Sequence, residues 1–215
     1  MKIFVFKIVL SLLSVSLFVF PDLIALSSLF PEIAQNNAQK KQTKQVIKWE
    51  IYRSEDNSFS VMMPVKPEHV EQSIDVPNTN LSIRYDTYVS EPSESVVYVV
   101  SVWHYPSEID MSKPEINLQD GFSGMLSALP GSEVIKMEMG KVDGFDAIEF
   151  LVKNEDIYFQ GKLILVHNTL YQVFTVYRDS IDMKKDYDEF MDSFSLLNTD
   201  QHKVVPKKAS RRMNI

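Results

Sequence analysis

The stretch Val96–Trp103, VVYVVSVW, decides the fold. Seven of its eight residues are apolar or aromatic, and the remaining one, Ser101, is small. A strand with one face in water alternates between apolar and polar residues, whereas a strand buried on both faces is a nearly continuous apolar run. We therefore expect this stretch to be the central strand of a sheet that is buried on both faces.

Strand patterns also precede this stretch. Leu81, Ile83, Tyr85 and Val89 alternate with polar residues, which predicts a strand with one buried face. Further back, Ile47–Arg53 and Phe59–Met63 flank a polar turn and predict a hairpin. Pro64, Pro67 and Pro77 argue against a helix between the hairpin and the strand.

Two amphipathic helices are predicted after the central strand. Ser112 and Glu115 have the spacing of a capping box, and Pro130-Gly131 ends the first helix. The first apolar face consists of Leu118, Phe122, Met125, Leu126 and Leu129. The second consists of Met183, Tyr187, Phe190, Met191 and Phe194. Both sets follow the period of one helical face, so each helix has one side to bury.

Four strand candidates separate the two helices: Glu133–Val142, Phe145–Val152, Ile157–Val166 and Leu170–Tyr177. Their connections are short and contain turn residues. Short connections imply antiparallel neighbours, since a parallel crossover needs a dozen or more residues. The predicted fold class is α+β, with a mainly antiparallel sheet covered by the two helices, either as an α/β/α sandwich or in two layers.

Residues 1–27 have the pattern of a signal peptide or a signal anchor. The uncharged run Ile8–Phe20 is shorter than the roughly 20 residues of a membrane-spanning helix and fits the apolar region of a signal peptide. Ala25 and Ser27 favour cleavage before Ser28, whereas a cut after Ala34 is less favourable. The alternative is an uncleaved anchor that tilts and uses the apolar residues after Asp22 as extra length.

The rest of the chain divides into three parts. Residues 28–46 are expected to be a flexible polar linker, residues 47–198 a single α+β domain, and residues 199–215 a basic disordered tail. The chain has no cysteine, which excludes disulfides, thiolate metal sites and the acylated residue of a bacterial lipoprotein.

The charge is distributed unevenly. From Arg53 to Asp192 there are 11 Lys and Arg against 25 Asp and Glu, a net charge of −14, while both flanks are basic. Nucleic-acid binding draws on clustered positive charge, so the acidic body argues against it. The basic tail, and the N-terminal segment, could contact an anionic membrane.

No catalytic, cofactor-binding or metal-binding residues are predicted. Gly121-Phe122-Ser123-Gly124 lacks the last glycine of a nucleophile elbow, and its glycines are expected to let the helix approach the sheet. The four histidines do not have metal-ligand spacing, and His104 is expected to cap a strand edge. They are His69, His104, His167 and His202.

Two other residue groups also have structural interpretations. Four aspartates crowd the second helix and its approach, and they are expected to form a solvated face because no calcium-loop motif is present. They are Asp182, Asp186, Asp188 and Asp192. Five aromatic residues in the middle of the sheet are expected mainly to pack across strands, with a ligand or partner surface as the alternative. They are Tyr85, Tyr88, Tyr98, Trp103 and Tyr105.

Short motifs of the domain resemble a known family. Phe59–Pro64 (FSVMMP), followed by Pro67, resembles the opening element of the PsbP-like superfamily, and Phe190–Phe194 (FMDSF) resembles its closing helix end. Gly161 and Leu170-Tyr171 fit its usual sheet. The resemblance implies an antiparallel sheet covered by helices and a role in binding rather than catalysis. No site residue is transferred from the family to this chain, because fold transfers poorly to function.

These observations together predict an exported, non-catalytic binding or accessory protein of the bacterial cell envelope, located in the periplasm or secreted, or membrane-anchored if the N-terminal segment is retained. Its expected partner is a protein or another envelope component. The alternatives are a secreted effector and an envelope hydrolase whose groups converge only in three dimensions. A carboxylate and a histidine within hydrogen-bond reach in one pocket would favour the hydrolase.

Overall fold

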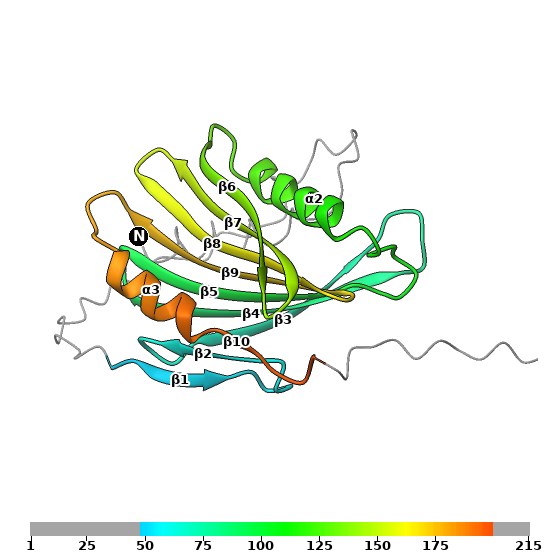
Figure 1. The fold of residues 1–215 in the computed structure, drawn as a ribbon, viewed down its shortest axis with the longest axis horizontal. Helices are drawn as coiled ribbons and strands as arrows, with labels where there is room; N and C mark the ends of the chain where they lie inside the picture. Colours follow the sequence, from blue (N-terminus) through cyan, green and yellow to red (C-terminus); the bar gives the residue numbers. More distant parts are fainter. Residues whose placement is uncertain (1–47, 200–215) are drawn as a thin grey trace, which may run out of the picture.

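The computed structural model describes residues 48–199, which form two antiparallel sheets and two helices (Figure 1). The large sheet has the order β3-β4-β5-β9-β8-β7-β6 and the small sheet the order β1-β2-β10. The large sheet contains β3 (Glu68–Asp75), β4 (Ser82–Ser93), β5 (Val96–His104), β9 (Thr169–Arg178), β8 (Ile157–Val166), β7 (Phe145–Asn154) and β6 (Glu133–Val142). The small sheet contains β1 (Glu50–Arg53), β2 (Phe59–Met63) and β10 (Ser195–Leu196).

Strand β5 is an inner strand of the large sheet, as its apolar run predicts. It pairs with β4 on one side and β9 on the other, and residues 96–103 are all buried. Val99 and Trp103 belong to the core on one face of the sheet, whereas Tyr98 and Val100 belong to the core on the other. Burial on both faces explains why the sequence of β5 does not alternate.

Two-residue turns connect β6, β7, β8 and β9, so these four strands form an antiparallel meander. In the first turn, Asp143 and Gly144 both have positive φ, at 51° and 86°. Positive φ at both central residues is the requirement of a type I′ turn, which matches the twist of the flanking strands. The four predicted strands between the helices are therefore confirmed.

Helix α2 (Pro114–Ser127) covers one face of the large sheet. Leu118, Phe122, Met125 and Leu129 pack against side chains of the strands, as their spacing predicts. The predicted capping box is wrong: the N-cap is Lys113, and no side chain caps the helix with a hydrogen bond. Ser112 instead donates its backbone N–H to Asp110 Oδ1 at 2.9 Å, so it belongs to the turn before the helix.

Helix α3 (Lys184–Ser193) and the small sheet together cover the opposite face. Met183, Tyr187, Phe190, Met191 and Phe194 are all buried, which confirms the predicted helical face. Ser193 joins the two elements, because its hydroxyl oxygen accepts a hydrogen bond from the backbone N–H of Met62 at 2.8 Å. The predicted N-terminal hairpin forms, but it belongs to this small sheet, which β10 completes.

The predicted α+β class, with a mainly antiparallel sheet covered by two helices, is confirmed. The predicted export segment (1–27), the linker (28–46) and all but the first residue of the tail (199–215) lie outside the described residues and stay predictions. Within residues 48–199, neither helix has the length and apolar character needed to cross a membrane.

Candidate functional site

Helix α3 leaves part of its face of the large sheet uncovered. Along β8, alternate residues on this face change from Ile164 and Val166, which lie in the α3 core, to Lys162, Gln160 and Tyr158. These polar residues are only partly buried. On this face β8 is apolar where α3 covers it and polar where α3 does not, because side chains that face water need not be apolar.

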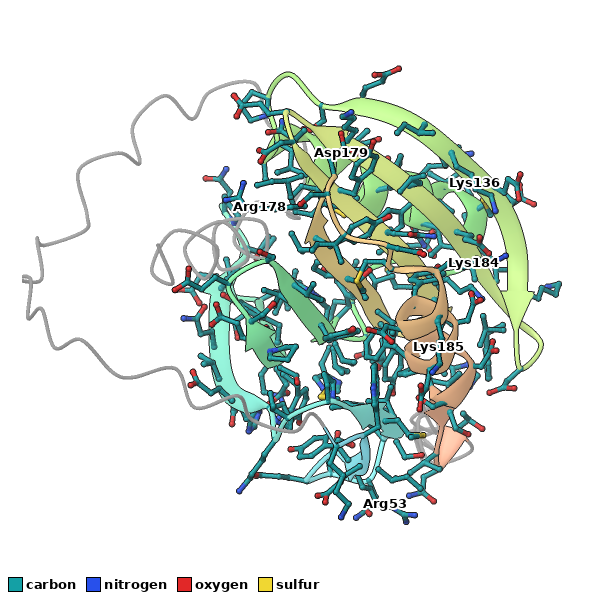
Figure 2. All side chains as sticks on the ribbon, turned by 90° about the vertical axis from the view of Figure 1, so that its left-hand side faces the viewer. Arg53, Lys136, Arg178, Asp179, Lys184 and Lys185 are labelled. Carbon is teal, nitrogen blue, oxygen red and sulfur yellow. The ribbon has the colours of Figure 1, made fainter. Side chains whose placement is uncertain are left out.

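An open groove of about 530 Å³ lies there, between the start of α3 and the strands β7, β8 and β9. Figure 2 looks onto this side of the molecule and labels Asp179, after the end of β9, and Lys184, in the first turn of α3. The groove is lined by Glu149, Tyr158, Gln160, Tyr177, Asp179, Ile181, Asp182, Met183, Lys184, Tyr187 and Asp188.

Two tyrosines and a glutamine form one wall of the groove. The rings of Tyr158 and Tyr177 are stacked, with centroids 5.4 Å apart and planes inclined by 16°. The hydroxyl of Tyr177 donates a hydrogen bond to Gln160 Oε1 at 2.8 Å. Their strand register holds them together, because Tyr158 lies directly opposite Tyr177. The wall presents aromatic surface, and the hydroxyl of Tyr177 is paired with Gln160.

Tyr187 contributes a buried hydroxyl that has no hydrogen-bond partner among the described residues. Its side chain projects from α3, and the residue is only 8% exposed. Burial, and then the negative charges of Glu149 and Asp188 together with other nearby groups, raise the pKa of Tyr187, so its hydroxyl stays protonated near neutral pH. A buried polar group without a partner is costly, which makes this hydroxyl a candidate ligand contact.

Four carboxylates border the groove, and they are not equally neutralised. Glu149 forms ion pairs with Lys136 at 2.6 Å and Lys162 at 4.0 Å. Asp179 is 3.5 Å from Lys153. Asp182 and Asp188, by contrast, have no ion pair within residues 48–199. The groove therefore combines two carboxylates that have no ion pair with aromatic surface, although Lys184 also lines it and Lys153 lies over the Tyr158 ring.

A second polar cluster brings two histidines to one carboxylate. Nε2 of His69 on β3 lies 2.9 Å from Asp86 Oδ1, and Nε2 of His104 lies 3.5 Å from Asp86 Oδ2. The ring of His69 stacks on Tyr88 at a centroid distance of 4.4 Å. Glu55, from the turn between β1 and β2, is 3.8 Å from His69 Nδ1. The cluster thus connects three strands of the large sheet to the small sheet.

The serines beside this cluster organise the β1–β2 turn. Ser54 and Ser58 are 3% and 2% exposed, and Ser54 Oγ accepts hydrogen bonds from the backbone N–H groups of Ser58 and Phe59. Burial opposes the ionisation of Asp56, but hydrogen bonds from Ser54 and Ser58 and the charge of His104 lower its pKa overall. The Ser54 hydroxyl donates to the carbonyl of Phe59, and the Ser58 hydroxyl lies 3.3 Å from Ser54 Oγ, so both hydroxyls have contacts within the turn.

The histidine and carboxylate pair that would favour a hydrolase therefore exists, but it does not line either of two grooves found among residues 48–199. Neither the α3 groove nor the one between β1, β2 and Pro92 is lined by His69, Asp86 or His104. Within the same part of the chain, no group of three or more His, Asp or Glu side chains is arranged to hold a metal ion. The cluster has the geometry of a structural connection between the sheets.

The structure separates the residues that the sequence singled out. Four of the five aromatic residues in the middle of the sheet are buried, and Tyr105, the fifth, packs against the α2 core. Gly121 lies against Leu170, so its predicted packing role is confirmed, and Ser123 is an exposed residue within α2. His104 ends β5, as expected, and His167 lies in the β8–β9 turn.

The sequence does not predict the groove, although some of the residues that line it belong to predicted features of α3. Asp182 and Asp188 were expected to form a solvated face, and Tyr187 belongs to the predicted apolar face of α3. A signal was present in β8, where the residues at alternate positions change from apolar to polar halfway along the strand. Only the length and position of α3, however, show that these positions form a groove.

The comparisons with known proteins concern the fold alone. No protein-family model matches the chain, and no curated protein matches it in sequence. Among solved structures, it is similar to the cyanobacterial PsbP (CyanoP) of Synechocystis sp. PCC 6803, with a TM-score of 0.49 and 12% identity over 73% of this chain and 97% of that one. It is also similar to PA94, a Pseudomonas aeruginosa protein of unknown function, with a TM-score of 0.33 and 9% identity over 75% and 99% of the two chains.

Proposed function

We propose that this chain is an exported, non-catalytic binding protein of the cell envelope, and that its α3 groove holds a basic side chain of a protein partner. The observation that carries the proposal is the hydroxyl of Tyr187, which is buried without a partner at the edge of a carboxylate-lined groove. A lysine or arginine N–H could donate to this oxygen. Asp182 and Asp188 would neutralise its charge, and the ring of Tyr177 would contact its alkyl chain, since Lys153 Nζ already lies 5.0 Å from the centroid of the Tyr158 ring.

The charge of the whole domain supports this choice of partner. The net charge of −14 between Arg53 and Asp192 attracts a basic surface over a longer range than the groove itself. Charge complementarity of this kind mainly increases the association rate and selects the partner. It also makes the binding sensitive to salt, because the Debye length falls from about 10 Å at 0.1 M to about 3 Å at 1 M.

Binding of a hexalysine peptide to the full chain tests the groove. We expect measurable binding at low salt, and a loss of at least about tenfold in affinity when Asp182→Asn and Asp188→Asn are combined, since both carboxylates lose their charge. Isothermal titration calorimetry measures both affinities. The matched control combines Glu115→Gln and Asp120→Asn, which removes the same charge from exposed positions of α2. Equal losses of peptide affinity in the two double variants would show that the peptide binds through net charge and not in the groove.

Tyr187→Phe should increase stability while weakening peptide binding. It removes a buried hydroxyl that has no partner, so we expect the free energy of unfolding to rise by about 1 kcal/mol. Tyr177→Phe is the matched control, because the Tyr177 hydroxyl donates to Gln160 and its removal should destabilise the protein. Urea unfolding of both variants measures the two changes. A loss of stability in Tyr187→Phe would show that its hydroxyl has a partner.

The export part of the proposal rests on the N-terminal sequence. We expect cleavage before Ser28, because Ala25 and Ser27 supply the small side chains that signal peptidase accepts. The intact mass of the protein recovered from the cell envelope or the medium measures the cleavage position. A mass that includes residues 1–27 would instead indicate a signal anchor.

A further inference from the structure

Strand β6 is an edge of the large sheet and exposes an unusual amount of apolar surface. It pairs with β7 on one side only. Of the six large hydrophobic side chains that are exposed among residues 48–199, four lie on this strand. They are Val134, Ile135, Met137 and Met139, with exposed fractions of 43%, 48%, 42% and 42%. An exposed edge strand with apolar side chains is a template for pairing with another strand.

The charges of β6 favour a second copy of the same strand as that partner. If two copies pair antiparallel about a two-fold axis at Met137, Lys136 of each copy lies opposite Glu138 of the other. Met137 then faces its own counterpart, whereas Ile135 is the extra residue of a bulge between Val134 and Lys136 and takes no regular place in the pairing. Residues directly opposite each other lie on the same face, where opposite charges stabilise the pairing. The surface is thus self-complementary, as a two-fold interface requires.

Neighbouring registers are less favourable. An axis at Lys136 or at Glu138 would place two identical charges directly opposite each other, which destabilises strand pairing. An axis at Met139 would leave Lys136 opposite Val142 and Glu138 opposite Gly140, so that neither charge is paired across the interface. The bulge between Val134 and Lys136 precedes the central residues and leaves the strand regular from Lys136 onward.

We propose that β6 pairs antiparallel with β6 of a second copy about a two-fold axis at Met137, which joins the two seven-stranded sheets into one continuous sheet. Each copy then covers the edge backbone and the apolar side chains of the other. None of the groove residues belongs to β6, although Lys136 of β6 also forms ion pairs with Glu138 of its own copy at 3.2 Å and with the groove residue Glu149 at 2.6 Å.

A cysteine cross-link tests the register, since the natural chain has no cysteine. In Met137→Cys the two Cα atoms would be about 4.5 to 5.5 Å apart, which is within the range of a disulfide. We expect mild oxidation of the full chain to convert most of this variant into a disulfide-linked dimer. A reductant should return that dimer to monomeric chains. The matched control is Met139→Cys, which has the same strand, face and exposure, but whose Cα atoms would be about 14 Å apart.

The outcomes are distinct. Cross-linking of Met137→Cys but not of Met139→Cys supports the proposed pairing. Equal cross-linking of both variants, cross-linking at Met139 alone, or none at either position would overturn it.

The charge pairs provide a second test that does not use cysteine. Glu138→Lys places a lysine opposite Lys136 of the other copy, and we expect the dimerisation affinity to fall at least about tenfold. Sedimentation equilibrium of the full chain measures this affinity, and a thermal melt confirms that the variant is folded. An unchanged affinity, or a wild-type chain that stays monomeric at all concentrations, would contradict the proposal. If the wild-type chain is monomeric, the exposed edge of β6 would instead be a site for a strand from another protein.

Discussion

Gly161→Ala is expected to destabilise the protein by at least about 3 kcal/mol, because the new methyl group has no room. Gly161 lies in β8 directly opposite Phe174 of β9. A Cβ built at this position would lie 2.2 Å from the backbone oxygen of Val173 and 2.4 Å from Phe174 Cβ. Both strands lie in the interior of the sheet, so the backbone cannot move away without disturbing the neighbouring strands.

Gly140→Ala is the matched control for this prediction. Gly140 lies on the edge strand β6, and a Cβ there would have no heavy atom within 4 Å. We expect a change of at most about 1 kcal/mol, in the stabilising direction, because alanine restricts the unfolded chain. Urea unfolding of the two variants separates the effect of space from that of composition. Equal destabilisation would mean that the strands β8 and β9 are farther apart than described.

Phe190→Ala should destabilise the protein by about 3 to 5 kcal/mol. Phe190 is fully buried between α3 and the large sheet, and its ring packs edge-on against Tyr98 at a centroid distance of 5.1 Å. The ring also occupies the centre of a core that includes residues of β2, so the cavity would loosen the small sheet as well. A thermal or urea melt measures the loss.

Asp188→Ala is the control for this second prediction, because it lies on the exposed face of the same helix. We expect a change in stability of less than about 0.5 kcal/mol. A similar loss for Phe190→Ala and Asp188→Ala would refute the orientation of α3 on the sheet.

The sequence predicted the elements whose local pattern and tertiary environment agree. The apolar run of β5, the two-residue turns from β6 to β9 and the apolar face of α3 all have the structure that their patterns predict. In each case a residue's burial follows from its position within its own element. Such local signals are strong when the element is long and its pattern is regular.

The missed features depend on pairing between distant parts of the chain. Strand β3 reads EHVEQSID, which is polar and bounded by prolines, and it is a strand because β4 offers it eight consecutive partners. Strand β10 has only two residues, Ser195 and Leu196, and they are a strand because they pair with Ser60 and Phe59 of β2. Propensity is a weak guide for such edge elements, since their neighbours decide their conformation.

The α3 groove and the histidine cluster were unpredictable for the same reason. The groove combines residues from Glu149 to Asp188 that only the register of three strands and the position of one helix bring together. His69 meets Asp86 through the pairing of β3 with β4, and the sequence analysis did not predict β3. The spacing of the histidines in the sequence does not predict this contact, because His69 and His104 reach Asp86 from two different strands.

The two cores of the domain lie on opposite faces of the same large sheet. Val99 belongs to the α2 core and its neighbour Val100 to the α3 core, so both cores share the backbone of β5. Opening either core would therefore expose the same strands, and we expect the amide hydrogens of β5 and β9 to exchange only through global unfolding. A ligand present at 100 times its dissociation constant would add about 2.7 kcal/mol to that opening free energy. A ligand in the α3 groove would thus slow hydrogen exchange at amides that it never touches.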